Sequence, residues 1–195
     1  MIYKEVREDL LSFAPDYYLV HCIGADFEIP QTSGVSNVLN NKYNIVSTLR
    51  QRHGHDILKQ WDANPTGTCL LEKNIFNLII KRTFAGKPTY DILRNALISM
   101  RHIMEAQGIT KIAMPKIGAA KDGLSWPEVV KIIEEVFNDT DFEIVVRSYK
   151  PNEEPLHTSP KDNYKSRINQ TDFAELNLMK EGKRFESDYD RFKRK

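Results

Sequence analysis

Two short loops of small residues each follow an apolar segment and precede a helical pattern, an arrangement that can bind an anion. The loops are residues 31–34 and residues 118–120, and a carboxylate at Asp122 follows the second. At a helix N-terminus backbone N–H groups point outward, and small side chains let a phosphate approach them. Two such loops on one sheet would suit a diphosphate. Neither loop matches GxxxxGKS/T or GxGxxG, which disfavours an ordinary P-loop or dinucleotide-binding fold.

Lys81 and Asp122 carry the most reactive side chains near these loops. Lys81 ends the apolar run NLIIK, and a lysine amine becomes a nucleophile only after a neighbour has taken its proton. Taken alone, Lys81 is typical of a solvated strand end, and Asp122 followed by Gly123 is typical of a turn. His21, within the apolar run LVHCI, is more typical of a hydrogen-bonded core histidine than of an acid or base.

The elements that would position these groups alternate along the chain. Strands are predicted over residues 2–7, 17–23, 67–73, 75–81, 109–115 and 142–149, with a hairpin turn at Lys73 and Asn74. Helices are predicted from Val35 to residues 53–55, from Pro88 to Gly108, and after a Ser125–Glu128 capping box. Strands alternating with helices predict an α/β fold, a layered sandwich with a mixed central sheet.

Composition excludes several other classes of protein. The 195 residues carry a net charge of +1, which argues against a globally basic nucleic-acid binder, and no apolar segment approaches transmembrane length. Without such a segment we expect a soluble protein. Two cysteines cannot build a disulfide framework, which favours a reducing, cytoplasmic setting. We also expect a monomer. No CxxC or HExxH spacing occurs, and we expect neither a metal nor a cofactor. Residues 1–150 are expected to form the domain, and the polar residues 151–195 a linker or tail with short helices.

Residues 2–150 resemble a macrodomain, the ADP-ribose-binding α/β/α module. The matching segments are REDLL, LVHCI, LIIKRTFAGKPTYDIL and AMPKIGAAKDGLSWPEVVKIIEEVF. Among macrodomains, the chain is most similar to the terminal ADP-ribose protein glycohydrolase class, which includes antitoxins that remove ADP-ribose from DNA. The resemblance implies a three-layer α/β/α fold with a mixed sheet, followed by a C-terminal extension.

The resemblance also implies roles for individual residues. Lys81 and Asp122 match the family's catalytic lysine and aspartate. Asp9 matches the acid that accepts a hydrogen bond from the adenine amino group, although it could instead cap or terminate the first strand. The other residues implied to line the ADP-ribose site are His21, Gly24, Thr32, Ser33, Gly34, Val35, Ile117, Gly118, Ala119, Ala120 and Lys121.

Three departures from the family pattern bear on the chemistry. Other hydrolytic macrodomains carry a catalytic asparagine in an Asn-Ala-Ala-Asn run, where this chain reads HCIGAD, so it resembles the lysine type instead. The first phosphate loop of the family reads Met-Gly-Ala-Gly-Ile-Ala, and QTSGVSN keeps only Gly34. Ala120 stands where glycine is usual. The replacements are small, so a phosphate can still approach the backbone, but a positive φ becomes costly there.

Three functions follow as hypotheses. The first is a glycohydrolase that removes mono-ADP-ribose from an acidic protein side chain or a DNA base, through a lysine–sugar adduct assisted by an aspartate. The second is a non-catalytic ADP-ribose-binding module, suggested by the altered first loop. The third is a scaffold whose tail recruits a partner. The basic segment 81–88 and the terminal RFKRK could contact nucleic-acid phosphates, but solvated segments explain both more simply, so nucleic acid is expected only as a substrate.

Overall fold

The computed structural model describes residues 1–29, 34–119 and 121–148, so the predicted tail lies outside the described residues. These segments contain a six-stranded sheet in the order β1-β6-β5-β2-β4-β3. The strands are β1 (Ile2–Val6), β2 (Tyr18–Gly24), β3 (Thr68–Glu72), β4 (Ile75–Lys81), β5 (Lys111–Pro115) and β6 (Glu143–Arg147). β3 is antiparallel to β4, and the other neighbouring strands are parallel. The sheet is therefore mixed, as predicted.

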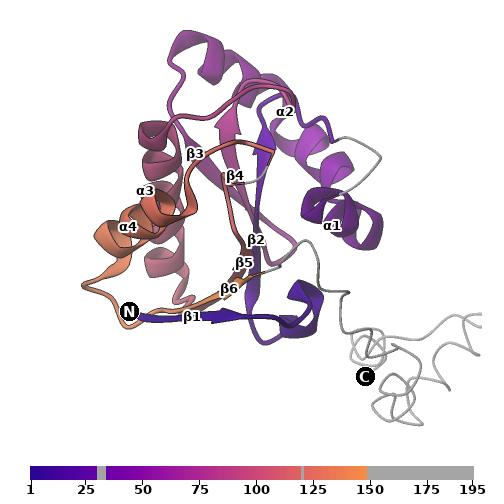
Figure 1. The fold of residues 1–195 in the computed structure, drawn as a ribbon. Coiled ribbons are helices and arrows are strands. Elements are labelled where there is room, and N and C mark those ends of the chain that lie inside the picture. Colours follow the sequence, from indigo (N-terminus) through magenta and orange to yellow (C-terminus); the bar gives the residue numbers. More distant parts are fainter. Residues whose placement is uncertain (30–33, 120, 149–195) are drawn as a thin grey trace, which may run out of the picture. The chain divides into compact units, whose positions relative to one another are not determined.

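Helices cover both faces of this sheet. The helices are α1 (Val35–Tyr43), α2 (Ile45–Ala63), α3 (Tyr90–Gln107) and α4 (Trp126–Phe137), and a short 3₁₀ helix, η1 (Leu10–Phe13), follows β1. α1 and α2 lie on one face, and α3 and α4 on the other (Figure 1). The predicted three-layer α/β/α architecture is confirmed. No helix in the described segments is both long and apolar enough to cross a membrane.

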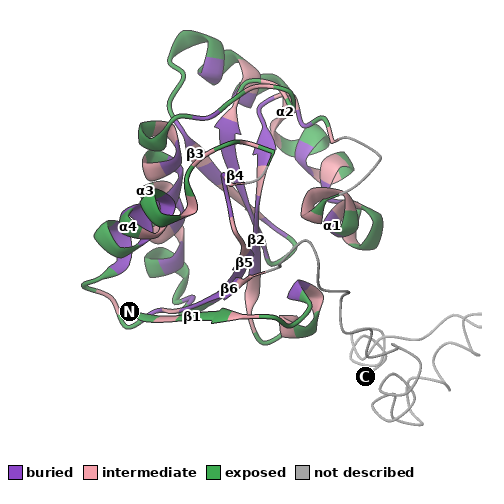
Figure 2. Cartoon of the chain, viewed as in Figure 1, coloured by how far each residue is buried: buried purple, intermediate pink, exposed green. Residues whose placement is uncertain are grey.

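The core is divided by the sheet into two apolar clusters. Leu19 and Ile23 of β2 join the cluster beneath α1 and α2, whereas Val20 joins the cluster beneath α3 and α4. This alternation is the period-two pattern of a strand that is covered on both faces. Figure 2 shows the result, with the inner strands buried between helices whose outer surfaces are exposed, whereas the edge strand β1 is largely exposed. In β4 all residues are buried until Lys81, which is half-buried.

Local chemistry fixes the β3–β4 hairpin. Lys73 and Asn74 connect the strands with φ angles of 51° and 60°. Positive φ at both central residues matches the right-handed twist of the two strands, and asparagine tolerates it better than most residues. The predicted hairpin is confirmed at these two residues.

The single helix predicted after Val35 is wrong, because the chain forms two. Asn44 separates α1 from α2 in a left-handed conformation with φ 50° and ψ 44°. The Asn40 side-chain oxygen accepts a hydrogen bond from the Val46 N–H at 3.0 Å and so satisfies a free donor at the start of α2. Apolar spacing continues through the break, so periodicity alone does not reveal it.

Two predicted helix starts also need correction. Pro88 is not the first residue of α3, because Thr89 is the N-cap and its hydroxyl accepts from the Ile92 N–H at 3.3 Å. Ser125 is the N-cap of α4, but its side chain makes no capping hydrogen bond. Both donors of a capping box are engaged elsewhere, because the Ser125 N–H donates to the Tyr90 hydroxyl at 3.1 Å and the Glu128 N–H donates to the Ser125 carbonyl at 3.1 Å.

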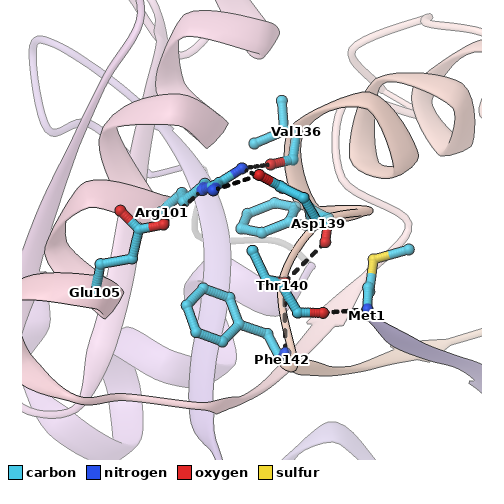
Figure 3. A network of polar contacts seen from close by, with 8 residues as sticks. Met1, Arg101, Glu105, Val136, Asp139, Thr140 and Phe142 are labelled. Atoms are coloured by element: carbon cyan, nitrogen blue, oxygen red, sulfur yellow. Dashed lines mark hydrogen bonds and ion pairs between the residues drawn. The ribbon is translucent and has the colours of Figure 1, made fainter.

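A polar network joins α3 to the turn after α4. Arg101 donates to the Val136 carbonyl at 2.7 Å and to both carboxylate oxygens of Asp139 at 2.6 and 3.0 Å. The Met1 amino group donates to the Thr140 carbonyl in the same turn. Figure 3 shows these groups converging on the end of α4. The network therefore ties the first strand and both helices of this layer together.

We expect Gly67→Ala to destabilise the fold severely. A Cβ at Gly67 would lie 1.8 Å from the Ile92 carbonyl oxygen, so α3 must move away from the residues that lead into β3. The free energy of unfolding in urea should fall by about 3 kcal/mol or more. Gly54→Ala is the matched control, since its Cβ meets only Arg50 Cβ at 3.9 Å within α2. That change should stabilise the protein by up to about 1 kcal/mol, and equal losses in both variants would contradict the argument.

Candidate active site

The site forms where parallel strands end at one edge of the sheet. Lys81 is the last residue of β4, and Asp122 lies in the loop after β5. The Lys81 Nζ lies 2.6 Å from the Asp122 Oδ1, and the two side chains are only 12% and 14% exposed. The carboxyl ends of parallel strands are the usual ligand-binding edge of an open α/β sheet. The topology thus joins two residues that are 41 positions apart.

The loop after β5 is closed by its own backbone. Gly118 has a φ of 67°, and its carbonyl accepts from the Leu124 N–H at 2.9 Å. The Asp122 N–H donates to the Ala119 carbonyl at 3.3 Å. Positive φ at Gly118 carries little cost because glycine has no Cβ. These bonds hold the Asp122 carboxylate in place opposite Lys81.

A pocket of about 330 Å³ surrounds this ion pair. Its lining comes from the ends of β2 and β4, the loop after each, the start of α1 and the loop after β5: Cys22, Ile23, Gly24, Glu28, Ile29, Gly34, Ser36, Lys81, Phe84, Ala85, Gly86, Lys87, Lys121 and Asp122. Burial, and to a smaller degree the charge of Asp122, raises the pKa of the Cys22 thiol to about 12. The thiol is therefore protonated at neutral pH and is no nucleophile. Among the described residues that line the pocket, Lys81 is thus the nucleophile that lies next to an acid.

A second pocket of about 330 Å³ lies at the start of η1 and α1. It is lined by Asp9, Leu10, Leu11, Gly34, Val35, Val38, Leu39 and Arg147. Gly34 also lines the pocket around Lys81, so the two pockets meet at this residue. One Asp9 oxygen accepts from the Leu11 N–H at 3.2 Å and caps η1. Asp9 therefore caps η1 and not the first strand, which ends at Val6, and the same residue lines a largely apolar pocket.

A larger hollow of about 430 Å³ lies between the loop after β2 and helices α1 and α2. Its carboxylate, Glu28, is paired with Arg50 at 2.5 Å, and three asparagines make up much of the remaining wall. Its described lining contains no nucleophile beside an acid, whereas the lining of the pocket around Lys81 does.

The structure brings together many of the residues implied by the resemblance. Gly24, Gly34, Lys81, Lys121 and Asp122 line the pocket around Lys81, and Asp9, Gly34 and Val35 line the second pocket. Ile117 and Gly118 are buried and Ala119 is half-buried, and all three support the loop rather than line a pocket. Thr32, Ser33 and Ala120 lie outside the described residues.

Gly24 is required by close packing. A Cβ at Gly24 would lie 2.8 Å from the Thr83 carbonyl carbon and 3.0 Å from the Phe84 nitrogen. The loop after β4 is held against β2 at this point, since the Phe84 N–H donates to an Asp26 carboxylate oxygen at 3.2 Å. Any larger residue would push this loop away from the pocket.

His21 lines neither pocket. It is 1% exposed, and its two ring nitrogens lie 2.9 Å from the Ser36 hydroxyl and 2.7 Å from the Asn77 amide oxygen. Burial lowers the pKa of His21 to about 4. The ring is therefore neutral at neutral pH, as expected for a hydrogen-bonded core histidine.

Sequence reasoning missed several pocket residues. Ser36 and Val38 lie on α1, Phe84 and Lys87 lie in the loop after β4, and Arg147 ends β6. Arg147 had a usable signal, since it lies near the end of the strand predicted over residues 142–149, and the carboxyl end of a parallel strand reaches the same edge as Lys81. No group of three acidic, histidine or cysteine side chains in the described segments could hold a metal ion.

Comparison with known proteins decides the family. No family model matches the chain. A bovine protein named ADP-ribose glycohydrolase OARD1 is 33% identical over 144 residues, which span 72% of this chain and 88% of that protein. The chain belongs to the macrodomain ADP-ribose glycohydrolases, a family of hydrolases.

Solved structures agree with the fold of this macrodomain. The macrodomain of Mycobacterium tuberculosis DarG matches with a TM-score of 0.60 and 16% identity, covering 76% of this chain and 99% of that one. Thermosipho africanus DarTG, solved in complex with ADP-ribose, matches with a TM-score of 0.57 and 14% identity, covering 83% of this chain and 45% of that one. At these identities the likeness supports the fold.

We expect the stability of this macrodomain to fall with acid in a way that depends on His21. Burial lowers the pKa of His21 from 6.5 to about 4. Between these values the unfolded chain binds a proton that the folded chain does not, so stability is lost as the pH falls from 6.5 to 4. The loss due to His21 should be about 3 kcal/mol.

Urea unfolding at several pH values measures this loss. His21→Gln removes the titrating ring, so its unfolding free energy should fall less steeply across the same interval. Carboxylates that titrate below pH 5 affect both proteins alike and cancel in the comparison. Parallel curves for the two proteins would show that His21 is not the group responsible.

Proposed function

We propose that this macrodomain removes mono-ADP-ribose from a modified macromolecule, with Lys81 and Asp122 as catalytic residues. The proposal depends above all on the 2.6 Å contact between the Lys81 Nζ and the Asp122 Oδ1 within the pocket at the strand ends. It is supported by membership of a family whose bovine relative is named an ADP-ribose glycohydrolase.

The two adjoining pockets suggest how ADP-ribose would lie. The adenine would occupy the pocket at Asp9, and the terminal ribose the pocket at Lys81. The diphosphate would cross at Gly34, where the two pockets meet. Gly34 is the N-cap of α1, so backbone N–H groups of the first turn are near the crossing point. Pockets of about 330 Å³ each are within the size range of ordinary small-molecule sites.

Proton transfer between the two catalytic residues would start the reaction. A lysine ammonium has no lone pair, so it must lose a proton before it can attack. The Asp122 carboxylate is close enough to take this proton directly. The resulting carboxylic acid can then protonate the group that leaves the anomeric carbon of the terminal ribose.

Lys81 would then capture the sugar. The bonds from the anomeric carbon to the ring oxygen and to the attached group break, while the amine nitrogen forms a carbon–nitrogen double bond to this carbon. The attached group leaves with the Asp122 proton, and one amine proton passes to the ring oxygen, which becomes a hydroxyl. Water would hydrolyse this adduct, assisted by the Asp122 carboxylate as a general base. The net reaction consumes one water and yields free ADP-ribose and the unmodified macromolecule, with Lys81 regenerated. The attached group would be an acidic protein side chain or a DNA base.

We expect Lys81→Arg and Asp122→Asn to lose turnover while keeping the fold. Arginine retains the positive charge and a partner for Asp122, but it cannot be deprotonated in a protein. Asparagine retains the shape of Asp122 but cannot accept the lysine proton. Release of ADP-ribose should fall about a thousandfold or more in each variant, measured on ADP-ribosylated protein and ADP-ribosylated DNA in parallel.

Two controls make this experiment decisive. Lys131→Ala removes an exposed lysine on α4 that pairs with Glu128 and lines neither pocket, and it should leave turnover unchanged. Borohydride added during turnover should trap a sugar adduct on Lys81 in the unmodified protein. Undiminished turnover in both catalytic variants would refute the mechanism. ADP-ribose binding without hydrolysis of either substrate would favour the binding module instead.

Asp9 should determine the preference for adenine. Its carboxylate would accept a hydrogen bond from the adenine amino group, which hypoxanthine lacks. The unmodified protein should therefore bind ADP-ribose about tenfold more tightly than IDP-ribose, as measured by calorimetry. Asp9→Ala should bind the two ligands equally. A preference that survives this substitution would exclude Asp9 as the adenine acceptor.

A further inference from the structure

A chain of three polar side chains crosses the apolar layer beneath α1. It runs from Asn77 on β4 through His21 on β2 to Ser36 in the first turn of α1, with contacts of 2.7 and 2.9 Å. Asn77 is 0% exposed and His21 is 1% exposed, and they are register partners in adjacent parallel strands. Apolar residues could fill this space at least as stably, so the polar chain calls for an explanation beyond stability.

Hydrogen bonding fixes the direction of this chain. The Asn77 amide nitrogen donates to the carbonyls of Leu70 at 3.1 Å and Ile75 at 2.8 Å, so its oxygen must face His21. The facing nitrogen, His21 Nε2, therefore carries the proton. The neutral ring then offers Nδ1 as an acceptor to the Ser36 hydroxyl, whose single proton lies between this nitrogen at 2.9 Å and the Cys22 carbonyl at 3.1 Å. Each group in the interior part of the chain thus has one defined orientation.

The far end of the chain reaches the site. Ser36 lies two residues after Gly34 and lines the pocket around Lys81. Its single hydroxyl proton can go to His21 Nδ1 or to the Cys22 carbonyl, and because both acceptors lie on β2, the hydroxyl attaches the first turn of α1 to this strand in either case. Within α1 only Leu39 is fully buried. Apolar packing alone therefore anchors this nine-residue helix weakly.

We propose that His21 is a positioning residue: with Asn77 it orients Ser36 and so holds the first turn of α1 against the pocket. The proposal rests on the proposed function, because it assigns the turn beside Gly34 to ADP-ribose binding. His21 acts on the ligand through Ser36 and touches neither pocket itself. A fixed first turn keeps Gly34 and its backbone donors in one arrangement before the ligand arrives, which lowers the ordering cost of binding.

A double-mutant cycle tests the proposal in the full-length protein. Ser36→Ala and Asn77→Leu should each weaken ADP-ribose binding about tenfold by calorimetry. The double variant should bind no more weakly than the weaker-binding single variant, because either change already interrupts the chain. KM for the ADP-ribosylated substrate should rise by the same factor, with kcat within about twofold, since neither residue acts in the chemical step.

Ser99→Ala is the matched control. Ser99 also joins a helix to a strand, because its hydroxyl accepts from the Cys69 N–H at 3.1 Å, but it lies on α3 and lines neither pocket. Its loss should lower stability without changing the dissociation constant or KM. All measurements should be made well below the midpoint of thermal unfolding, so that only folded protein is compared.

The outcomes separate this inference from the proposed function. Failure of the unmodified protein to bind ADP-ribose would refute the proposed function. Binding that is unchanged in Ser36→Ala and Asn77→Leu would refute the positioning role alone. Additive losses in the double variant, or an equal loss in Ser99→Ala, would also refute it, because separate or general effects would then explain the data.

Discussion

The ion pair between Lys81 and Asp122 is the interaction on which the site depends. Both side chains are mostly buried, so each charge has lost most of its water and is compensated chiefly by the other. Removal of either partner leaves an uncompensated charge at the sheet edge. The net charge of the pair is zero both as ammonium with carboxylate and, after the proposed proton transfer, as amine with carboxylic acid. The contact therefore compensates the charge of Lys81 where little water reaches it, and in the proposed mechanism it supplies the acceptor for the lysine proton.

The sheet and helix α1 contribute to the site in different ways. β2, β4 and β5 are buried between helical layers, so the backbone around Cys22, Lys81 and the loop after β5 is held by packing on both faces. α1 has one fully buried residue, Leu39, and reaches the same site from outside the sheet. The proposed catalytic pair thus lies on the well-packed part of the fold, and the proposed phosphate-crossing turn lies on the weakly packed part. Directional hydrogen bonds such as the one between His21 and Ser36 are most useful where a weakly packed helix turn meets the buried sheet.

Sequence patterns predicted the features that depend on interactions between neighbouring residues, and they missed the contacts that depend on the order of the strands in the sheet. The turn at Lys73 and Asn74 and the buried run of β4 follow from neighbouring residues, as does the layered fold. The break at Asn44 was missed because the apolar period runs through it. The meeting of Lys81 with Asp122, 41 residues apart, required the resemblance to a family, since only the strand order brings them together. Asn77 and Ser36 carried no signal, because a lone polar residue in an apolar run does not reveal its partner.

Three glycines near these elements illustrate why one residue type serves different constraints. At Gly67 and Gly24 there is no room for a side chain, since a Cβ would lie 1.8 and 2.8 Å from backbone atoms. Gly34 has no atom within 4 Å of the Cβ position, and its constraint is a φ of 111°. This conformation is accessible essentially to glycine alone. Because Gly34 starts α1 where the two pockets meet, the direction of the helix and the continuity of the binding surface both depend on that one backbone angle.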